Sequence, residues 1–216
     1  MANATAAVTH GEHEPTTTGL DHRKLLMWAF LGSDCMFFGT LIATYLVYKN
    51  KSIEGALPID VFDIPVTSVS TFVLLMSSMS MVMAYAWLTR GNLKAFRIWL
   101  ASTAIMGATF LAFQMFEFRD FAVHGQLTPR TNLFGSTFFT LTGFHGAHVT
   151  LGVVWLLSIL FHSFRKGGVT PEKNLDVDLA ALYWHFVDIV WIVIFTVVYL
   201  FGVFEGFPGA AVSTGH

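Results

Sequence analysis

The sequence is short of charge. Asp, Glu, Lys and Arg together make up 12% of its 216 residues, whereas about a quarter of an ordinary soluble domain is charged. Hydrophobic residues make up 54%, and they form long uncharged runs separated by polar connectors. This pattern predicts a polytopic membrane protein. The net charge of −2 comes without any basic patch, so we expect no nucleic-acid partner.

Cysteine and proline are also scarce. Cys35 is the only cysteine, which excludes an intramolecular disulfide, a thiolate metal cluster and a C-x-x-C-H haem attachment. Because Cys35 lies in an apolar run, we expect an inert, buried thiol. None of the six prolines falls inside an apolar run, which argues against the broken helices of many transporters.

Five apolar stretches approach the roughly 20 residues that a helix needs to cross a bilayer. These candidate spans are residues 25–48, 66–89, 96–117, 134–162 and 181–204. We therefore predict an all-α fold, a bundle of five transmembrane helices within residues 24–206. A flexible polar tail, 1–23, precedes the bundle, and a short external tail, 207–216, follows it.

Lysine and arginine are distributed unevenly between the two sides of such a bundle. The N-terminal tail and the second and fourth connectors carry 8 of them, and the other two connectors carry 4. By the positive-inside rule, the N-terminus is expected in the cytoplasm and the C-terminus outside.

Asp34 lies in the first span, about ten residues from its start and so roughly 15 Å deep. An ionised carboxylate at that depth is costly. Two hypotheses remain open: a proton-linked or gating carboxylate, and a protonated acid that is hydrogen-bonded to a neighbouring helix.

Glycines at helical spacing predict close contact between helices. Gly32 and Gly39 lie on a stripe of small residues in the first span, and Gly143 and Gly146 lie in the segment 134–151. Small residues allow helix backbones to approach each other in a membrane. We expect these four glycines to pack against protein.

His145 and His148 are three residues apart and so lie on one side of the fourth span. Two histidines are too few for a usual zinc site, and haem needs ligands placed across helices. We predict histidines that are hydrogen-bonded inside the bundle, with no metal or cofactor bound by this chain.

Gln114 and Glu117 are one turn apart in the third span, and both are candidate polar residues of the bundle or of a subunit interface. Glu117 lies near the external end of the span. There we expect a solvated or helix-capping acid.

The fifth span opens with an aromatic and polar segment. His185 and Asp188 are three residues apart, so the carboxylate could orient the imidazole. Trp184, Asp188 and Trp191 share one helix face. This seam suits docking onto another membrane subunit and suits internal packing equally well.

Five motifs, in order along residues 25–204, carry a family resemblance: FLGSDCMFFGTLIATYL, STFVLLMSSMSMVMA, GATFLAFQMFEF, GSTFFTLTGFHGAHVTLG and YWHFVDIVWIVIFTVVYLFG. Together they closely resemble subunit III of the haem–copper respiratory oxidases. The family usually has Glu where this chain has Asp34, and longer members have two more N-terminal helices. The five-span form resembles bacterial members.

The resemblance implies a non-catalytic subunit of a bacterial cytochrome c oxidase in the cytoplasmic (inner) membrane, without catalytic, cofactor-binding or metal-binding residues of its own. Catalytic subunit I, with subunit II in the same complex, would hold the haems and copper, reduce oxygen to water and translocate protons. This chain would stabilise subunit I and support its proton uptake, with phospholipid bound.

Three other functions stay open at this point. The first is subunit III of a quinol oxidase. The second is a free-standing membrane haem protein, with His145 or His148 and His185 as axial ligands. The third is a transporter with Asp34 as its proton-coupled site, although five spans do not divide into equal inverted repeats.

Overall fold

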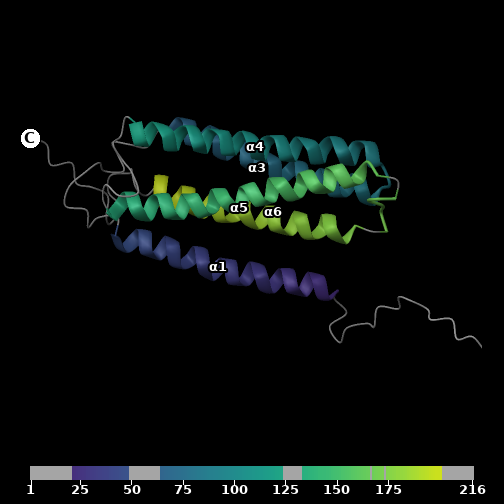
Figure 1. The fold of residues 1–216 in the computed structure, drawn as a ribbon, viewed down its shortest axis with the longest axis horizontal. Coiled ribbons are helices and arrows are strands. Elements are labelled where there is room, and N and C mark those ends of the chain that lie inside the picture. Colours follow the sequence, from purple (N-terminus) through teal and green to yellow (C-terminus); the bar gives the residue numbers. More distant parts are fainter. Residues whose placement is uncertain (1–20, 49–63, 124–132, 166, 173, 201–216) are drawn as a thin grey trace, which may run out of the picture.

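The computed structural model describes residues 21–48, 64–123, 133–165, 167–172 and 174–200 (Figure 1). These residues form helices joined by short turns, which confirms the all-α prediction. The helices are α1 (His22–Tyr48), α3 (Ile64–Thr89), α4 (Leu93–Val123), α5 (Leu133–Ser163), α6 (Leu175–Ile194) and a terminal π-helical turn, η1 (Phe195–Leu200). Five helices in this part of the chain are long and apolar enough to cross a membrane, as predicted.

Several helix ends differ from the predicted spans, and α4 continues to Val123, six residues beyond the predicted end at residue 117. α1 begins at His22, so the tail predicted to reach residue 23 ends earlier. α6 begins at Leu175 rather than residue 181, and its first turn carries Asp176 and Asp178. Acidic side chains stabilise the positive end of the helix dipole, which explains why a helix starts among residues expected in a connector. The rest of both predicted tails lies outside the described residues.

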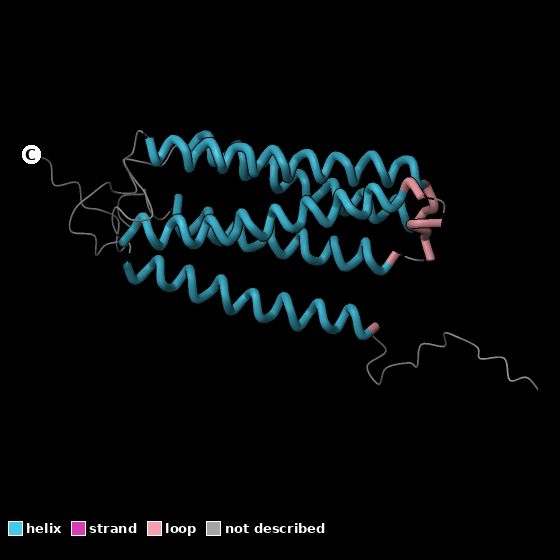
Figure 2. The backbone as a smooth tube through the Cα atoms, in the orientation of Figure 1, coloured by secondary structure: helices cyan, strands magenta, loops and turns pink. Residues whose placement is uncertain are grey.

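The helices run side by side along one long axis (Figures 1 and 2). α3 and α4 form one side of the bundle, α5 and α6 lie next to them, and α1 lies on the far side. α1 makes its main contacts with α5 and α6, whereas α3 and α4 pack closely on each other. α1 is therefore the peripheral helix of the five.

The turn between α3 and α4 is fixed by two adjacent residues. Gly91 has a positive φ of 78°, a conformation that favours glycine, and its N–H donates to the Leu88 carbonyl over 2.9 Å. The Asn92 side chain then accepts from the Ala95 N–H over 3.2 Å, at the start of α4. Gly91 ends α3 and Asn92 caps the start of α4. Because the connection is so short, α3 and α4 must be antiparallel neighbours.

The close approach of α4, α5 and α6 depends on glycines that the sequence analysis missed. A Cβ atom on Gly107 would lie 2.5 Å from Cη2 of Trp184, and one on Gly152 would lie 2.9 Å from its Cζ3. Trp184 is buried, and its indole N–H donates to Ser77 on α3 over 3.0 Å. The Trp184 ring therefore fills a slot that exists only because neither glycine has a side chain.

Only one of the four predicted glycines makes a close contact within this chain. A Cβ on Gly32, Gly39 or Gly143 would meet no atom of another described helix within 4 Å, so the prediction of close packing at these three stays open to contacts outside this chain. Gly146 does pack inside the bundle, since a Cβ there would lie 3.0 Å from Oε1 of Gln114. Small residues at helical spacing permit close contact, but they do not determine which helix face is turned inward.

The outer surface is strongly apolar. Cys35, expected to be buried, is exposed on α1. Its neighbour Met36 is 76% exposed, and Leu26 on α1 and Ile98 on α4 are 72% and 70% exposed. Large apolar side chains in such numbers on the outside suit contact with lipid or with other membrane subunits.

Candidate functional site

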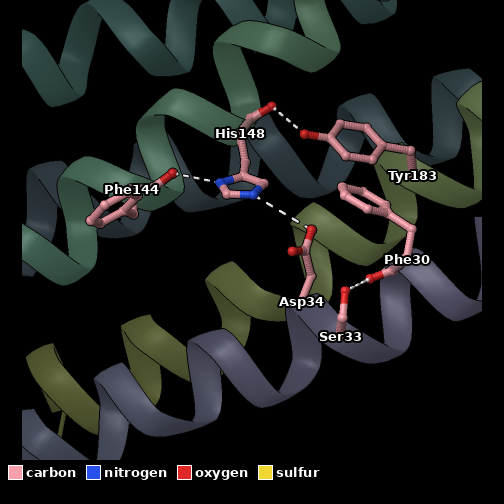
Figure 3. Close-up of polar contacts among 6 residues, drawn as sticks. All are labelled: Phe30, Ser33, Asp34, Phe144, His148 and Tyr183. Carbon is pink, nitrogen blue, oxygen red and sulfur yellow. Dashed lines mark hydrogen bonds and ion pairs between the residues drawn. The ribbon is translucent and has the colours of Figure 1, made fainter.

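A pair of ionisable side chains joins α1 to α5 (Figure 3). Oδ2 of Asp34 lies 3.5 Å from Nε2 of His148, and the two side chains are only 13% and 19% exposed. The structure thus brings together two residues that the sequence analysis had placed in different spans without pairing them. The two atoms are close, but Oδ2 accepts no hydrogen bond from the described residues, so the contact is a proximity of two polar groups between α1 and α5.

The His148 ring is held on its other side as well. Its Nδ1 lies 2.8 Å from the Phe144 carbonyl oxygen, one helical turn earlier. Tyr183 of α6 donates from its hydroxyl to the His148 backbone carbonyl over 3.0 Å. The pair therefore lies where α1, α5 and α6 meet, and Tyr183 is a neighbour that the sequence analysis did not identify.

His145 is not the hydrogen-bonded histidine that was predicted. It is fully buried, and neither ring nitrogen has a hydrogen-bond partner among the described residues. Its ring stacks on Trp191, with centroids 4.9 Å apart, and contacts the edges of Phe38 and Phe110. The aromatic packing explains the burial, because three rings enclose the imidazole.

Gln114 lies at the contact of α4 with α5. Its Nε2 donates to the Thr142 carbonyl over 2.9 Å, and its Oε1 accepts no hydrogen bond from the described residues. The side chain rests against Gly146. Gln114 is thus an interhelical contact inside the bundle.

Glu117 is buried, which corrects the expectation of a solvated or capping acid. Thr67 of α3 donates from its hydroxyl to one carboxyl oxygen. Tyr199 of the π-helical turn donates to the other over 3.3 Å. Wide π turns occur often at functional sites, and this one brings the Tyr199 hydroxyl to Glu117.

His185 and Asp188 do not bond each other as the sequence suggested. Nδ1 of His185 lies 2.6 Å from the Ser78 hydroxyl of α3. Asp188 is 3% exposed, and neither of its oxygens accepts a hydrogen bond from the part of the chain that the structure describes. His185 therefore faces α3, across the bundle and not along its own helix, and the Ser78 hydroxyl is also the polar neighbour of Asp188.

The aromatic face of α6 is internal. The indole N–H of Trp191 donates to Thr71 over 3.0 Å, as that of Trp184 does to Ser77. Of the two uses left open for this seam, the structure shows internal packing against α3. The sequence did contain a signal: Thr67, Thr71 and Ser78 recur at i, i+4 and i+11 and so mark one polar face of the second span.

Ion pairs lie at the end of the bundle where α1 and α6 begin. Lys24 contacts Asp178 over 2.7 Å, and Arg23 contacts Asp176. These pairs attach the start of α1 to α6. Together with the Asp34–His148 pair, they give the peripheral helix polar attachments at two depths.

The described residues contain no group of three His, Cys, Asp or Glu side chains that could hold a metal ion. The polar groups that converge are instead carboxyls, imidazoles and hydroxyls. Such groups can hold and transfer protons, and they can hold helices together.

The comparisons with known proteins agree with one another. The family described as cytochrome c oxidase subunit III matches residues 4–203. Quinol oxidase subunit 3 of Bacillus subtilis strain 168 is 38% identical over 200 residues, which cover 89% of this chain and 97% of the relative. Cytochrome c oxidase subunit 3 of Alkalihalophilus pseudofirmus is 38% identical over 182 residues, 84% of this chain and 88% of the relative. Cytochrome bo(3) ubiquinol oxidase subunit 3 of Pseudomonas putida is 38% identical over 176 residues, 82% and 84% of the two chains.

Proposed function

Because this chain belongs to the cytochrome c oxidase subunit III family, we propose that it is the non-catalytic third subunit of a bacterial haem–copper terminal oxidase. The intact complex reduces oxygen to water and translocates protons. This chain stabilises the catalytic subunit and supports its proton uptake. The observation that carries the proposal is the family match over residues 4–203, a range that includes all five membrane-spanning helices.

The membrane histidines support placing the haems and copper in partner subunits. A haem ligand needs a ring nitrogen that faces an open coordination position. The His145 ring is enclosed by aromatic side chains. The His148 nitrogens face Phe144 and Asp34, and Nδ1 of His185 faces Ser78. These three histidines fit roles in helix packing better than haem ligation.

The exposed apolar side chains support a place inside a larger membrane assembly. We expect subunit I and subunit II of the oxidase as protein partners and phospholipid against the remaining surface. Met36 and Leu26 on the peripheral helix are largely exposed in the single chain. Packing of such side chains against neighbouring helices or acyl chains stabilises membrane complexes.

The cationic end of the bundle supports an orientation in the bacterial cytoplasmic membrane. Arg23, Lys24 and Arg97 lie at the end where α1, α4 and α6 begin. By the positive-inside rule, this end faces the cytoplasm. The N-terminus is then cytoplasmic, and the C-terminus is external.

The proposed role does not depend on the electron donor. Relatives named quinol oxidase subunit 3 and cytochrome c oxidase subunit 3 match at the same 38% identity. An accessory function shared by both classes of oxidase explains this equality. The partner subunits then decide between cytochrome c and quinol.

Purification through a tag on this chain, in mild detergent, tests the proposal. We expect a large haem-bearing subunit to co-purify and to be identified by mass. Reduced-minus-oxidised spectra should show haem in the complex and none in the chain after its partners are stripped. A haem signal that stays with the isolated chain would overturn the proposal, as would the absence of any haem-bearing partner.

A further inference from the structure

One histidine lies halfway through the membrane and is only partly covered by the bundle. His185 is half-buried and lies near the middle of its 25-residue span, Leu175–Tyr199. Its partner Ser78 on α3 is also half-buried and lies near the middle of the span Pro65–Thr89. The two side chains therefore reach the outside of the bundle together, at the depth that is furthest from both bilayer surfaces.

The His185 ring has only one of its two nitrogens bonded. Nδ1 lies 2.6 Å from the Ser78 hydroxyl. Nε2 makes no hydrogen bond with the described residues, and it does not belong to the nitrogen and oxygen atoms that are buried without a bond, so it opens to the outside. A ring nitrogen is a donor or an acceptor in either tautomer. Nε2 therefore requires a polar neighbour whichever tautomer is present.

Other polar side chains on the outside of the spans are satisfied by their own helix. The hydroxyls of Thr109, Thr150 and Thr196 each donate to the carbonyl oxygen four residues earlier, over 2.8–2.9 Å. Nε2 of His185 forms no such bond to a backbone carbonyl of the described helices. Its partner has to come from beyond the residues that the structure describes.

Lipid does not supply this partner. The hydrocarbon core of a bilayer is about 30 Å thick, so the ester and headgroup oxygens lie about 15 Å from its middle. An acyl chain against His185 would leave a polar nitrogen unsatisfied in hydrocarbon, which is costly. Polar side chains at mid-depth are instead satisfied by hydrogen bonds between helices.

The side chains around the two polar groups are apolar and exposed. On α3, Leu75 and Val82 lie one turn before and one turn after Ser78, and they are 36% and 50% exposed. On α6, Ile189 lies one turn after His185 and is 59% exposed. α3 and α6 pack on each other, so these five side chains form one surface, which we call the α3–α6 face. It has a polar centre and an apolar rim.

We propose that the α3–α6 face is the docking surface for one transmembrane helix of a neighbouring subunit, which presents a hydrogen-bonding side chain to Nε2 of His185 at mid-depth. The inference rests on the proposed function in one respect, that the neighbour is a subunit of the oxidase. The neighbouring helix covers the apolar rim, and the hydrogen bond fixes its depth relative to α3 and α6.

Photo-cross-linking in membranes, with the full chain and its partners, tests the proposal. The photoreactive residue p-benzoylphenylalanine replaces Ile189, and in the control it replaces Ile105, which lies at similar depth on α4 and is 66% exposed. The complex is purified through a tag on this chain, and cross-linked peptides are identified by mass. From position 189 we expect a cross-link to a transmembrane segment of another subunit with a hydrogen-bonding side chain near its middle. The yield to that segment should be well above the yield from position 105.

Variants of His185 give a second readout. His185→Leu removes both ring nitrogens, and it should weaken the association with the cross-linked subunit in mild detergent about threefold to thirtyfold, the worth of one hydrogen bond between membrane helices. His185→Gln keeps a hydrogen-bonding group and should retain most of the affinity. Ser78→Ala is the matched control, because it removes the bond inside this chain and leaves Nε2 in place. It should weaken the association less than His185→Leu does.

Four results would overturn the proposal. The first is cross-linking from position 189 to lipid only or to a second copy of this chain. The second is a cross-linked segment without a hydrogen-bonding side chain, or a yield no higher than that from position 105. The third is equal association of His185→Leu and the wild type. The fourth is a loss in Ser78→Ala as large as that in His185→Leu.

The two readouts separate this inference from the proposed function. The cross-links are formed with His185 in place, so the test remains valid even if a His185 variant fails to fold. A haem-bearing subunit that co-purifies while position 189 cross-links only to lipid refutes the docking surface and leaves the proposed function intact. A cross-link from position 189 to a polar transmembrane segment, in a complex without haem, supports the docking surface and refutes the proposed function.

Discussion

The slot around Trp184 makes a quantitative prediction. In Gly107→Ala the new methyl group would lie 2.5 Å from Cη2 of Trp184 and 3.0 Å from Cγ2 of Val153, so the ring or the α4 backbone must move. Overpacking a buried site typically costs about 1–3 kcal/mol. Gly39→Ala is the matched control, because its methyl group would meet no described atom within 4 Å.

Comparing the two variants removes the effect of alanine on the helix itself. Alanine favours a helix over glycine by up to about 1 kcal/mol, and both positions lie within helices, so this gain cancels in the difference. The remaining difference is the overpacking alone. This overpacking cost is about 1–3 kcal/mol. The equilibrium constant for unfolding should therefore be about fivefold to more than a hundredfold larger for Gly107→Ala than for Gly39→Ala.

The assay is equilibrium unfolding of the isolated chain in mixed micelles, followed by the loss of helical circular dichroism as the denaturing detergent increases. Trp184→Phe supplies the decisive test, because phenylalanine lacks the outer ring atoms that the Gly107→Ala methyl group would meet. The double variant should lose less stability than the sum of the two single variants. Strict additivity, or equal stability of Gly107→Ala and Gly39→Ala, would refute the packing argument.

Three further predictions concern polar contacts. Thr67→Val removes the hydroxyl that donates to buried Glu117 and should cost about 1–3 kcal/mol in the same unfolding assay; a cost near zero would contradict the contact. Reversing one charge of the ion pair, in Lys24→Asp or Asp178→Lys, should lower the free energy of unfolding by at most ~1 kcal/mol. The double variant should regain most of that loss at low salt. If the double variant regains no stability, the ion pair does not contribute as described. In the intact oxidase, Asp34→Asn should leave subunit assembly unchanged but shorten the period of activity during turnover, which oxygen-consumption traces would show; unchanged inactivation kinetics would refute this role.

The number of helices could be predicted from the sequence because a bilayer requires long uncharged runs, and this chain has five. The position of Asp34 near the middle of the first run followed from counting residues along it. Its partner did not, because pairing a residue of α1 with His148 of α5 depends on which helices are neighbours. Only tertiary packing supplies that information.

The glycines and Glu117 also show that the sequence pattern alone does not reveal which residues the packing of helices buries. Stripes of small residues pointed to Gly32 and Gly39, which meet no other described helix, and missed Gly107, which faces Trp184, one of the two largest buried side chains among the described residues. Glu117 was expected at the surface because it lies at the end of the predicted span, but α4 continues to Val123. The burial of Glu117 depends on Tyr199 in a π-helical turn, a backbone irregularity without a signal in the apolar pattern.

The peripheral position of α1 has a consequence for the order of biosynthesis. α1 is translated first, yet its main contacts are with α5 and α6, and Arg23 and its partner Asp176 are 153 residues apart. At roughly 5–20 residues per second, α1 waits on the order of ten seconds for those helices. Throughout this interval Asp34 is in the bilayer, or at its insertion machinery, without His148. Membrane insertion is therefore the stage at which this carboxyl is most exposed to lipid, and the last two helices end that exposure.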